Sequence, residues 1–445
     1  MVASEARAGR SIERTRQGQL VRAVAGAALA STVEWYDFFL FGYAAATVLG
    51  RLFFPTSNAF LSTLLVVTVY VAGFAIRPVG AFLFGHLGDR IGRKATLTAT
   101  LLLTGLATSL VAAAPTYAEA GVLGGIILVI LRLTQGLAVG GQWAGSVLLA
   151  VEWGHRGRRG FLGSWAQLGL PLGLALAFGS MQLFTAWLGT DAGWRFPFLL
   201  SVVPILVALY VRLGVSETPV FRQLLTERRI EQAPVAEVLV RQWREVALTA
   251  LLRIGQQTPL VLFTLFLLAN AEGALKLRQP AVLYFLLAAT AISVVAVLGW
   301  GFLSDIVGRR RLVMIGAAAM LVWAYPYWAL LGSRVPLLVL VAIVLSLPIH
   351  DMQLAPQAAL IAESFTGRLR YSGTALGSQL TTLLADGPAP LIAFALLQRF
   401  GDPRLIAIYV GVCAAITLAA TAALKDRSRQ DMSAEYDEPA PAISR

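Results

Sequence analysis

The stretch Gly85–Lys94, GHLGDRIGRK, lies where one long apolar run ends and the next begins. A near copy, Gly301–Arg310, GFLSDIVGRR, lies at the same kind of junction 216 residues further along the chain. At that offset Gly85, Leu87, Asp89, Gly92 and Arg93 of the first copy recur in the second, and Lys94 faces Arg310. A loop motif repeated between apolar hairpins, half a chain apart, indicates two related halves in a membrane.

The composition of the 445-residue chain independently indicates a membrane protein. Hydrophobic residues make up 57% of it and charged residues only 13%, whereas soluble domains carry roughly 25% charged residues. The mean hydropathy is +0.72. A helix that spans a bilayer needs about 20 apolar residues, and we find twelve such runs. They are 21–49, 61–87, 95–114, 121–151, 161–189, 194–213, 246–270, 281–303, 312–332, 336–362, 373–398 and 403–424.

These runs predict an all-α membrane protein whose twelve transmembrane helices form two pseudo-symmetric six-helix bundles. The predicted parts are an N-terminal tail (1–20), a first half (21–213), a linker (214–245), a second half (246–424) and a C-terminal tail (425–445). We expect the linker to be amphipathic helix, because 32 residues are too few for a core of their own. The polar C-terminal tail is expected to be disordered.

The distribution of basic residues predicts the orientation of the chain. The net charge is +12, and of 36 Lys and Arg we count 26 on the side of the N-terminus, 7 on the opposite side and 3 inside spans. Basic loops stay on the cytoplasmic side of a membrane. We therefore expect a multi-pass protein of the cell membrane with both termini in the cytoplasm. The positive charge does not indicate nucleic-acid binding, because no soluble basic domain holds it.

Charged side chains inside the predicted spans are candidates for transport chemistry, since charge at this depth usually faces a cavity, a partner or a proton path. Glu34 and Asp37 lie three residues apart in the first span and share a face. Arg77 lies in the second span and Arg132 in the fourth. We predict that these four couple proton and substrate movement, with Asp37 as the first candidate proton carrier, Glu34 as the second and Asp386 as the next.

Further polar and aromatic residues are predicted to line a central cavity. On the fourth span, Gln135 and Gln142 project within about 20° of each other. Arg253 and Gln256 share one face at the start of the second half. The complete predicted cavity set is Tyr36, Gln135, Gln142, Trp143, Arg253, Gln256, Gln379 and Asp386.

The repeated motif, G-x-L-x-D-x-x-G-R-[KR], resembles the loop between helices 2 and 3 of the major facilitator superfamily. Six further segments resemble the metabolite:proton symporter family, which includes permeases for shikimate, 2-oxoglutarate, citrate and proline/betaine. They are EWYDFFL from Glu34, RPVGA from Arg77, RLTQGL from Arg132, GWRFPF from Gly193, ETPVF from Glu217 and RYSG from Arg370. The resemblance runs from about Ala30 to Leu424 and implies the major facilitator fold.

The resemblance also implies a gate at the ends of the halves. There, Asp89 is expected to accept hydrogen bonds from backbone N–H groups at the start of helix 11. A second pattern, Glu-x6-Arg, is duplicated at 152–159 and 363–370. The predicted gating residues are Gly85, Asp89, Gly92, Arg93, Glu152, Arg159, Asp305, Gly308, Arg309, Glu363 and Arg370.

The function implied by the resemblance is secondary active transport: proton-coupled uptake of a small polar metabolite, an organic acid or zwitterion, by alternating access. Gln142 stands where the family usually has Glu, so the coupling is expected to depend on helix 1. Two alternatives remain, a proton-antiport exporter of a metabolite or drug and a non-transporting membrane sensor on the same scaffold. Uptake and export differ in the side on which substrate accumulates, and a sensor binds ligand without moving it.

Other classes of protein lack support in the sequence. No Gly-x4-Gly-Lys-Ser/Thr loop is present, so ATP is not expected to drive the protein. Three histidines and one cysteine, Cys413, are not expected to form a metal site or a Ser/His/Asp arrangement. We predict a monomer that is not an enzyme and has no cofactor. Its partners are a small substrate, protons and the lipid bilayer, with no nucleic acid.

Overall fold

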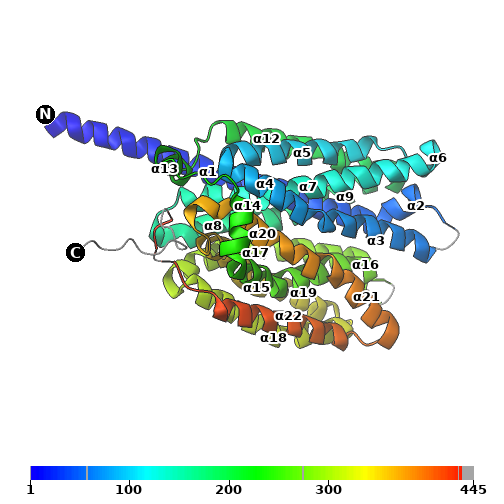
Figure 1. Ribbon diagram of the computed structural model, residues 1–445. Helices are drawn as coiled ribbons and strands as arrows, with labels where there is room; N and C mark the ends of the chain where they lie inside the picture. Colours follow the sequence, from blue (N-terminus) through cyan, green and yellow to red (C-terminus); the bar gives the residue numbers. More distant parts are fainter. Residues whose placement is uncertain (1, 57–58, 273–274, 429, 433–445) are drawn as a thin grey trace.

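The computed structural model describes residues 2–56, 59–272, 275–428 and 430–432. Residue 1 and residues 433–445 of the predicted tails lie outside the described residues. All regular structure in the described ranges is helical, with short 3₁₀ and π segments labelled η. The long helices run side by side, and the start of α1 (Val2–Ala44), the linker helices and the last turn of α22 (Arg404–Ala423) lie at one end (Figure 1). We call this the linker end and the opposite end the distal end.

The first half occupies one side of the molecule, above the second half in Figure 1. It contains α1 (Val2–Ala44), η1 (Ala45–Leu49), α2 (Gly50–Phe53), α3 (Ala59–Ala75), α4 (Arg77–Arg90), α5 (Arg93–Ala113), α6 (Tyr117–Ala120), α7 (Val122–Glu152), η2 (Arg156–Arg158), α8 (Arg159–Gln167), α9 (Gly169–Leu188), α10 (Thr190–Gly193), α11 (Arg195–Leu200) and α12 (Val202–Leu213). Two short linker helices follow, α13 (Pro219–Thr226) and α14 (Pro234–Arg241), at the linker end.

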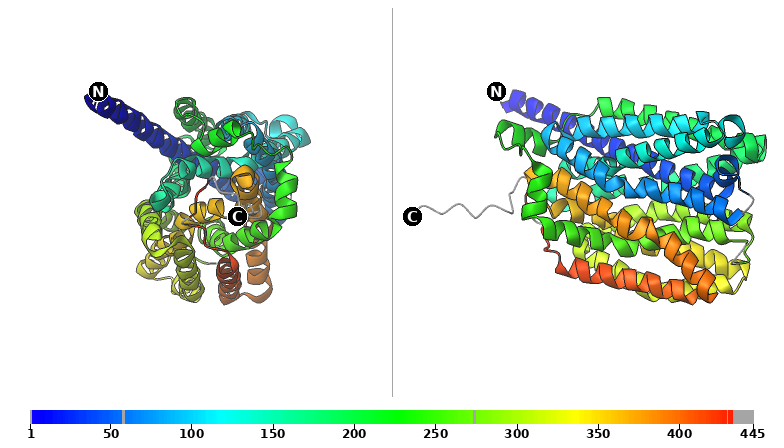
Figure 2. Two further views of the ribbon diagram at one scale, coloured as in Figure 1. Left: turned by 60° about the vertical axis from the view of Figure 1, so that its left-hand side comes forward. Right: turned by 45° about the vertical axis from the view of Figure 1, so that its right-hand side comes forward.

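The second half repeats the arrangement of long helices, and both views in Figure 2 keep it on its own side. It contains α15 (Trp243–Val261), η3 (Leu262–Phe266), α16 (Leu267–Asn270), α17 (Gln279–Val307), α18 (Arg309–Gly332), α19 (Pro336–Glu363), η4 (Gly367–Leu369), α20 (Arg370–Thr381), η5 (Thr382–Asp386), α21 (Pro388–Phe400) and α22 (Arg404–Ala423).

The helices agree with the predicted spans. Eleven helical stretches of the described residues are long and apolar enough to cross a membrane, and they coincide with the second to the twelfth predicted spans. The first predicted span is the apolar part of α1. That helix is absent from the eleven because Glu34 and Asp37 lower its hydropathy. Twelve helices in two bundles thus form the predicted all-α architecture.

The outer surface of the bundle is apolar, as a surface in contact with lipid must be. Large aliphatic side chains point outward from helices of both halves, such as Leu106 at 62% exposure and Val295 at 73%. Charged side chains within the spans are instead buried, among them Asp37, Arg132 and Asp351. This inversion of the pattern of soluble proteins places the polar chemistry inside the bundle.

Two glycines of the repeated motif directly precede α5 and α18 and have a backbone conformation that other residues rarely adopt. Gly92 has φ +113° and Gly308 has φ +102°. Only glycine enters this region without steric cost. The sharp turns allow α5 and α18 to start directly after the motif, which brings Arg93 and Arg309 back toward the aspartates of their own copies.

Candidate substrate cavity and gates

A polar cavity lies between the two halves. Residues of α1, α4 and α7 line it from the first half, and residues of α15, α20 and η5 line it from the second. The lining residues are Glu34, Trp35, Phe38, Arg77, Trp143, Arg253, Gln257, Ser378, Gln379 and Thr382. A site built from facing helices of both halves suits alternating access, because motion of the halves changes both walls together.

Two arginines enter the cavity, one from each half. The guanidinium of Arg77 lies 4.6 Å from the ring centre of Phe74, and that of Arg253 lies 4.3 Å from the ring centre of Trp143. Aromatic faces attract cations and hold them in place. Among the described residues, Nε of Arg77 and both Nε and Nη1 of Arg253 have no hydrogen-bond partner. Both guanidinium groups therefore retain donors for a ligand.

Other polar atoms near the cavity are also unsatisfied within the described part of the chain. Oε2 of Glu34 and Oε1 of Gln257 are buried and lack partners. The amide nitrogen of Gln257 donates to both carboxylate oxygens of Asp386, at 3.0 and 3.1 Å. Buried polar groups are almost always hydrogen-bonded, so this group of free donors and acceptors fits a polar ligand or water.

Asp37 belongs to a separate network inside the first half, outside the cavity lining. Its carboxylate accepts hydrogen bonds from Thr108 Oγ1 and Gln135 Nε2, both at 2.6 Å, and pairs with Arg132 at 3.3 Å. The guanidinium of Arg132 also lies 4.2 Å from the ring centre of Phe41. The structure therefore joins three predicted residues, Asp37, Arg132 and Gln135, and separates them from Glu34 and Arg77. Thr108 carried no signal in the sequence.

Several residues of the predicted cavity set point elsewhere. Tyr36 donates to the carbonyl oxygen of Pro197 at 2.6 Å. Gln142 donates to Ala30 O at 2.9 Å and accepts from Thr104 at 3.0 Å, which ties it into the first half. Gln256 contacts His350. Gln135 donates to Asp37, and Asp386 accepts from the lining residue Gln257. Trp143, Arg253 and Gln379 do line the cavity.

Five lining residues are absent from the predicted sets: Trp35, Phe38, Gln257, Ser378 and Thr382. Ser378 precedes Gln379, and Thr382 follows it by nearly one helical turn. A polar run Ser-Gln-x-x-Thr in an apolar span was the available signal. The aromatic pair carried no signal, because aromatic residues are frequent throughout these helices.

Four predicted gating residues form a cluster at the linker end, which we call the first gate: Asp89, Arg93, Glu152 and Arg370. Asp89 accepts hydrogen bonds from the backbone N–H groups of Tyr371 at 3.2 Å and Ser372 at 2.9 Å, in the first turn of α20. It also pairs with Arg93 at 3.1 Å. Arg93 and Arg370 flank Glu152 at 3.8 and 3.6 Å. These contacts join the two halves.

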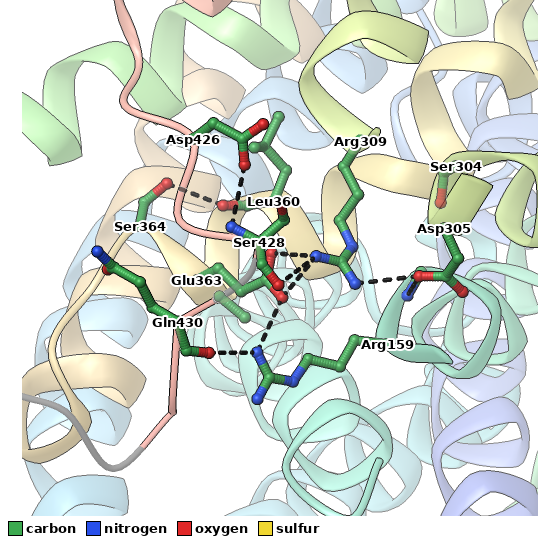
Figure 3. Close-up of polar contacts among 12 residues, drawn as sticks. Arg159, Ser304, Asp305, Arg309, Leu360, Glu363, Ser364, Asp426, Ser428 and Gln430 are labelled. Carbon is green, nitrogen blue, oxygen red and sulfur yellow. Dashed lines mark hydrogen bonds and ion pairs between the residues drawn. The ribbon is translucent and has the colours of Figure 1, made fainter. Parts of the chain in front are cut away.

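The second gate is formed by Asp305, Arg309, Glu363 and Arg159 (Figure 3). Asp305 accepts from the N–H groups of Gly160 at 2.9 Å and Phe161 at 2.8 Å, in the first turn of α8, and pairs with Arg309 at 3.0 Å. The carboxylate of Glu363 accepts from Arg309 at 2.7 and 2.8 Å and from Arg159 at 3.3 Å. The second gate thus repeats the layout of the first with the roles of the halves exchanged.

The duplicated Glu-x6-Arg patterns exchange partners between the halves. Arg159 of the first half pairs with Glu363 of the second, and Arg370 of the second half pairs with Glu152 of the first. Neither glutamate pairs with the arginine seven residues after it among the described contacts. Each pattern therefore supplies half of two ion pairs that span the interface, and both pairs must break when the halves separate at this end.

Small residues allow this close approach. A Cβ atom on Gly88 would lie 2.4 Å from the ring of Tyr371, and one on Gly301 would lie 2.3 Å from Oγ of Ser164. Gly85 faces the backbone of Ser372, with 3.1 Å from its Cβ position to Cα. Larger side chains at Gly88 and Gly301 would push the halves apart and separate the gate residues.

The start of the C-terminal tail packs over the second gate, and the prediction of disorder is wrong for residues 425–428 and 430–432. Arg159 Nη1 donates to Gln430 O at 3.0 Å, and Arg309 Nη1 to Ser428 O at 3.4 Å (Figure 3). Met432 is buried at 3% exposure. Guanidinium groups have five donors, so the gate arginines bind tail carbonyls as well as Glu363.

Asp426 orders this tail segment locally. Its carboxylate accepts from the backbone N–H of Ser428 at 3.0 Å. Burial raises the pKa of Asp426, but hydrogen bonds from Ser428 and the charges of Arg309 and Arg310 outweigh it, so the pKa is lowered. The carboxylate therefore stays ionised at neutral pH, where it keeps the turn that presents the Ser428 carbonyl to Arg309.

Comparison with known proteins agrees with this fold. The model of the family "Sugar (and other) transporter" matches residues 23–246 and 226–425. The chain is 34% identical over 420 residues to the shikimate transporter of Escherichia coli strain K12, covering 92% of this chain and 95% of that protein. This protein is a member of the Sugar (and other) transporter family and is a multi-pass membrane transporter.

Two further relatives show the range of the similarity. The inner membrane metabolite transport protein YhjE of Escherichia coli strain K12 is 33% identical over 402 residues, covering 88% of this chain and 91% of that protein. The proline/betaine transporter of Salmonella typhimurium strain LT2 is 27% identical over 428 residues, covering 93% and 85%. Among solved structures, the proton:xylose symporter XylE bound to 6-bromo-6-deoxy-D-glucose matches with a TM-score of 0.71 at 18% identity, covering 92% and 95%. That match establishes the shared fold.

Proposed function

We propose that this protein is a secondary active transporter that takes up a small carboxylate, either an organic acid or a zwitterion, together with protons. The observation that carries the proposal is the cavity with Arg77 and Arg253 on opposite walls, each with unsatisfied donors. A carboxylate placed between them accepts from both halves at once. The named substrates of its relatives, shikimate, proline and betaine, support this class, because all three contain a carboxylate.

Glu34 completes the chemistry of the cavity. A zwitterion has a cationic group as well as a carboxylate, and the carboxylate of Glu34 lies on the same cavity wall as Trp35 and Phe38. Aromatic rings beside a carboxylate suit an ammonium group, which they attract through their faces. With Glu34 protonated, the same cavity has two cations and no anion, which favours an organic acid. The state of Glu34 thus links proton binding to the charge of the cargo.

The contacts favour Glu34 over Asp37 as the proton carrier, which reverses the order predicted from the sequence. Asp37 accepts three hydrogen bonds, one from Arg132, and these stabilise its charged form. Oε2 of Glu34 has no donor among the described residues. The charged form of Glu34 is therefore less stabilised by hydrogen bonds than that of Asp37, so Glu34 takes up a proton more readily.

The proposed location, orientation and oligomeric state of the protein follow from the charge distribution and the fold. We place the protein in the cell membrane with both termini and the linker end in the cytoplasm, since basic residues concentrate there. The predicted division into halves 21–213 and 246–424, with linker 214–245 and tails 1–20 and 425–445, then corresponds to two rocking bodies with cytoplasmic connections. We propose a monomer, because one chain contains both walls of the cavity.

The substrate class is tested by binding and transport with purified protein. Thermal shift in detergent should detect shikimate, 2-oxoglutarate, citrate, proline or betaine but not xylose, which has no carboxylate. Stabilisation by xylose alone would contradict the carboxylate site. In vesicles with an imposed pH gradient, accumulation of the radiolabelled hit on the acidic side would identify an exporter, and binding without movement a sensor.

The proton carrier is tested by a matched pair of substitutions, Glu34→Gln and Asp37→Asn. Glu34→Gln should abolish uphill accumulation driven by a pH gradient but keep substrate exchange between loaded vesicles, because exchange needs no net proton movement. Asp37→Asn removes the ionic partner of Arg132 and should reduce accumulation and exchange together. Uphill accumulation in Glu34→Gln at the wild-type level would rule out Glu34 as the carrier.

A further inference from the structure

A second buried polar cluster lies inside the second half, outside the cavity lining. Its centre is His350 and Asp351 of α19, both at most 1% exposed. His350 Nδ1 lies 2.9 Å from Asp351 Oδ1, and Ser293 Oγ of α17 donates to Asp351 Oδ2 at 2.6 Å. On its other edge, His350 Nε2 contacts the amide nitrogen of Gln256 in α15. The cluster therefore connects three helices of one half.

The sequence analysis placed Gln256 in the predicted cavity set and expected no Ser/His/Asp arrangement. The structure does bring a serine, a histidine and an aspartate together, but in an order that does not suit nucleophilic catalysis. Ser293 donates to the aspartate and makes no contact with the imidazole among the described hydrogen bonds. A catalytic serine must instead be hydrogen-bonded to its general base. The cluster requires a different explanation.

The ionic surroundings of Asp351 are unusual for a fully buried carboxylate. Within the described chain its ion-pair partner is His350 alone. The other buried charged groups on the helices packed against α19 are engaged elsewhere. Tyr327 of α18 stacks on Phe263. Arg253 lines the cavity and Arg132 pairs with Asp37. The remaining buried charges form the ion pairs of the two gates: Arg159, Asp305, Arg309, Glu152 and Arg370.

This isolation determines how many protons the pair binds. A buried negative charge with no fixed cation is very costly. The combination of ionised Asp351 with neutral His350 has that uncompensated charge. Adding one proton gives either an imidazolium beside a carboxylate or a neutral imidazole beside a carboxylic acid, and both are neutral overall. The reference is a neutral histidine with an ionised aspartate, as these two groups occur in water. The buried pair therefore holds one proton more than that reference.

The two glutamines beside His350 respond to where that proton lies. The amide oxygen of Gln256 accepts from Gln357 Nε2 at 3.1 Å, and Oε1 of Gln357 has no partner among the described residues. In this orientation the Gln256 amide nitrogen donates to an unprotonated Nε2 of His350. If both amides turn over, Nε2–H of His350 donates to Gln256 Oε1, and Gln256 Nε2 donates to Gln357 Oε1. The turned chain uses the acceptor that is otherwise unpaired.

We propose that His350 and Asp351 form a second proton-binding site, in which protonation of His350 reverses the Gln256–Gln357 amide chain. Gln256, which contacts His350, is followed in α15 by the cavity-lining residue Gln257. The amide of Gln257 donates to Asp386. Reorientation of Gln256 therefore acts on the helix turn that lines the cavity from the second half. The role of this proton in the transport cycle rests on the proposed function; the existence of the site does not.

The three histidines of the chain allow a direct test. His86→Gln with His155→Gln leaves His350 as the sole imidazole, so ¹⁵N-histidine NMR of the purified protein reports this site alone. We expect both ring nitrogens to be protonated at low pH and one to lose its proton within or above about pH 5–8, the range in which histidine ordinarily titrates. Asp351→Asn in the same background should move that loss to lower pH, since it removes the anion that stabilises the imidazolium.

Ser293→Ala is the matched control. It removes a hydrogen bond that stabilises the ionised carboxylate of Asp351, so it should move the proton loss to higher pH, opposite to the shift expected for Asp351→Asn. An imidazole with one bare nitrogen at every pH, unchanged by Asp351→Asn, would overturn the proposal. If an Asp351 variant does not fold, the parent and Ser293→Ala spectra still decide whether His350 titrates.

The outcomes separate this inference from the proposed function. A titrating His350 together with uphill accumulation in Glu34→Gln would leave the second site in place and refute Glu34 as the carrier. A permanently neutral His350 together with loss of accumulation in Glu34→Gln would refute only the second site. His350→Gln should bind about one proton fewer per molecule in a potentiometric titration of the purified protein, and an unchanged proton count would also overturn the proposal.

Discussion

The first and second gates have the same layout, but their ion pairs differ in quality. In the first gate, the two arginines approach Glu152 only to 3.8 and 3.6 Å, and both oxygens of Glu152 lack a hydrogen bond within the described residues. In the second gate, Glu363 accepts from Arg309 at 2.7 and 2.8 Å and from Arg159 at 3.3 Å. Motif duplication therefore preserved the partners but not the strength of the contacts.

The covers of the two gates also differ, although each is the segment that follows the last helix of its half. The linker after α12 covers the first gate: Glu217 accepts from the backbone N–H of Lys94 at 3.1 Å, and the Phe221 ring lies 4.8 Å from the Arg93 guanidinium. The C-terminal tail after α22 covers the second gate through the carbonyls of Ser428 and Gln430. The linker over the first gate continues into further helices of the chain, whereas the segment over the second gate belongs to the C-terminal tail.

This comparison suggests that the second gate contributes more to closing the linker end through ion pairs, and that the first gate depends more on the Asp89 contacts and packing. A reporter for closure is available because Cys413 is the only cysteine. In a Cys413→Ser background, Ser378→Cys places a single thiol in the cavity. Its labelling rate by a polar maleimide added from the linker end measures how often that end opens.

The largest expected effect is that of Glu363→Gln. It leaves Arg159 and Arg309 without their carboxylate, and breaking a buried ion pair costs about 3–5 kcal/mol. Labelling from the linker end should therefore rise strongly. Glu152→Gln is the matched variant of the first gate and should raise labelling much less, because its contacts are longer. Equal effects of the two substitutions would show that distance does not determine the strength of these pairs.

An intermediate effect is expected for Asp89→Asn and Asp305→Asn. Each aspartate accepts two backbone hydrogen bonds at a helix N-terminus, where a carboxylate contributes up to about 2 kcal/mol when partly buried. Both variants should open the linker end to a similar degree and reduce transport while expression is retained. Normal transport by Asp89→Asn would refute its gating role, and a large difference between the variants would show that the shared layout does not make the two positions equivalent.

The smallest effect is expected from the covers. Arg427 donates to Ser364 O and pairs with Glu245 at 3.5 Å, which holds the tail in place. Partly exposed ion pairs contribute about 1 kcal/mol or less, so Arg427→Ala should raise labelling slightly and more at high temperature. Glu217→Gln tests the linker cover in the same assay. An effect of Arg427→Ala as large as that of Glu363→Gln would make the tail a principal part of the second gate.

Much of the architecture was predictable from local sequence. Apolar runs of sufficient length must be helical in a bilayer, because every backbone group needs an internal partner there. The duplicated GHLGDRIGRK and GFLSDIVGRR motifs predicted the two halves. These features depend on residues close together in the chain, so the length of the apolar runs, the repeat of the motif and the composition suffice to detect them.

What only the tertiary structure decided is which partner each buried charge has. Glu34 and Asp37 share a face of α1, yet one lines the cavity and the other pairs with Arg132 behind it. The Glu-x6-Arg patterns look self-contained, yet their pairs cross between halves. His350 has no evident partner in the sequence, yet the structure places Gln256 beside its imidazole and Ser293 beside the carboxylate of Asp351. The free energy of a buried charge depends on groups a few ångströms away in space, and those neighbours come from distant parts of the chain.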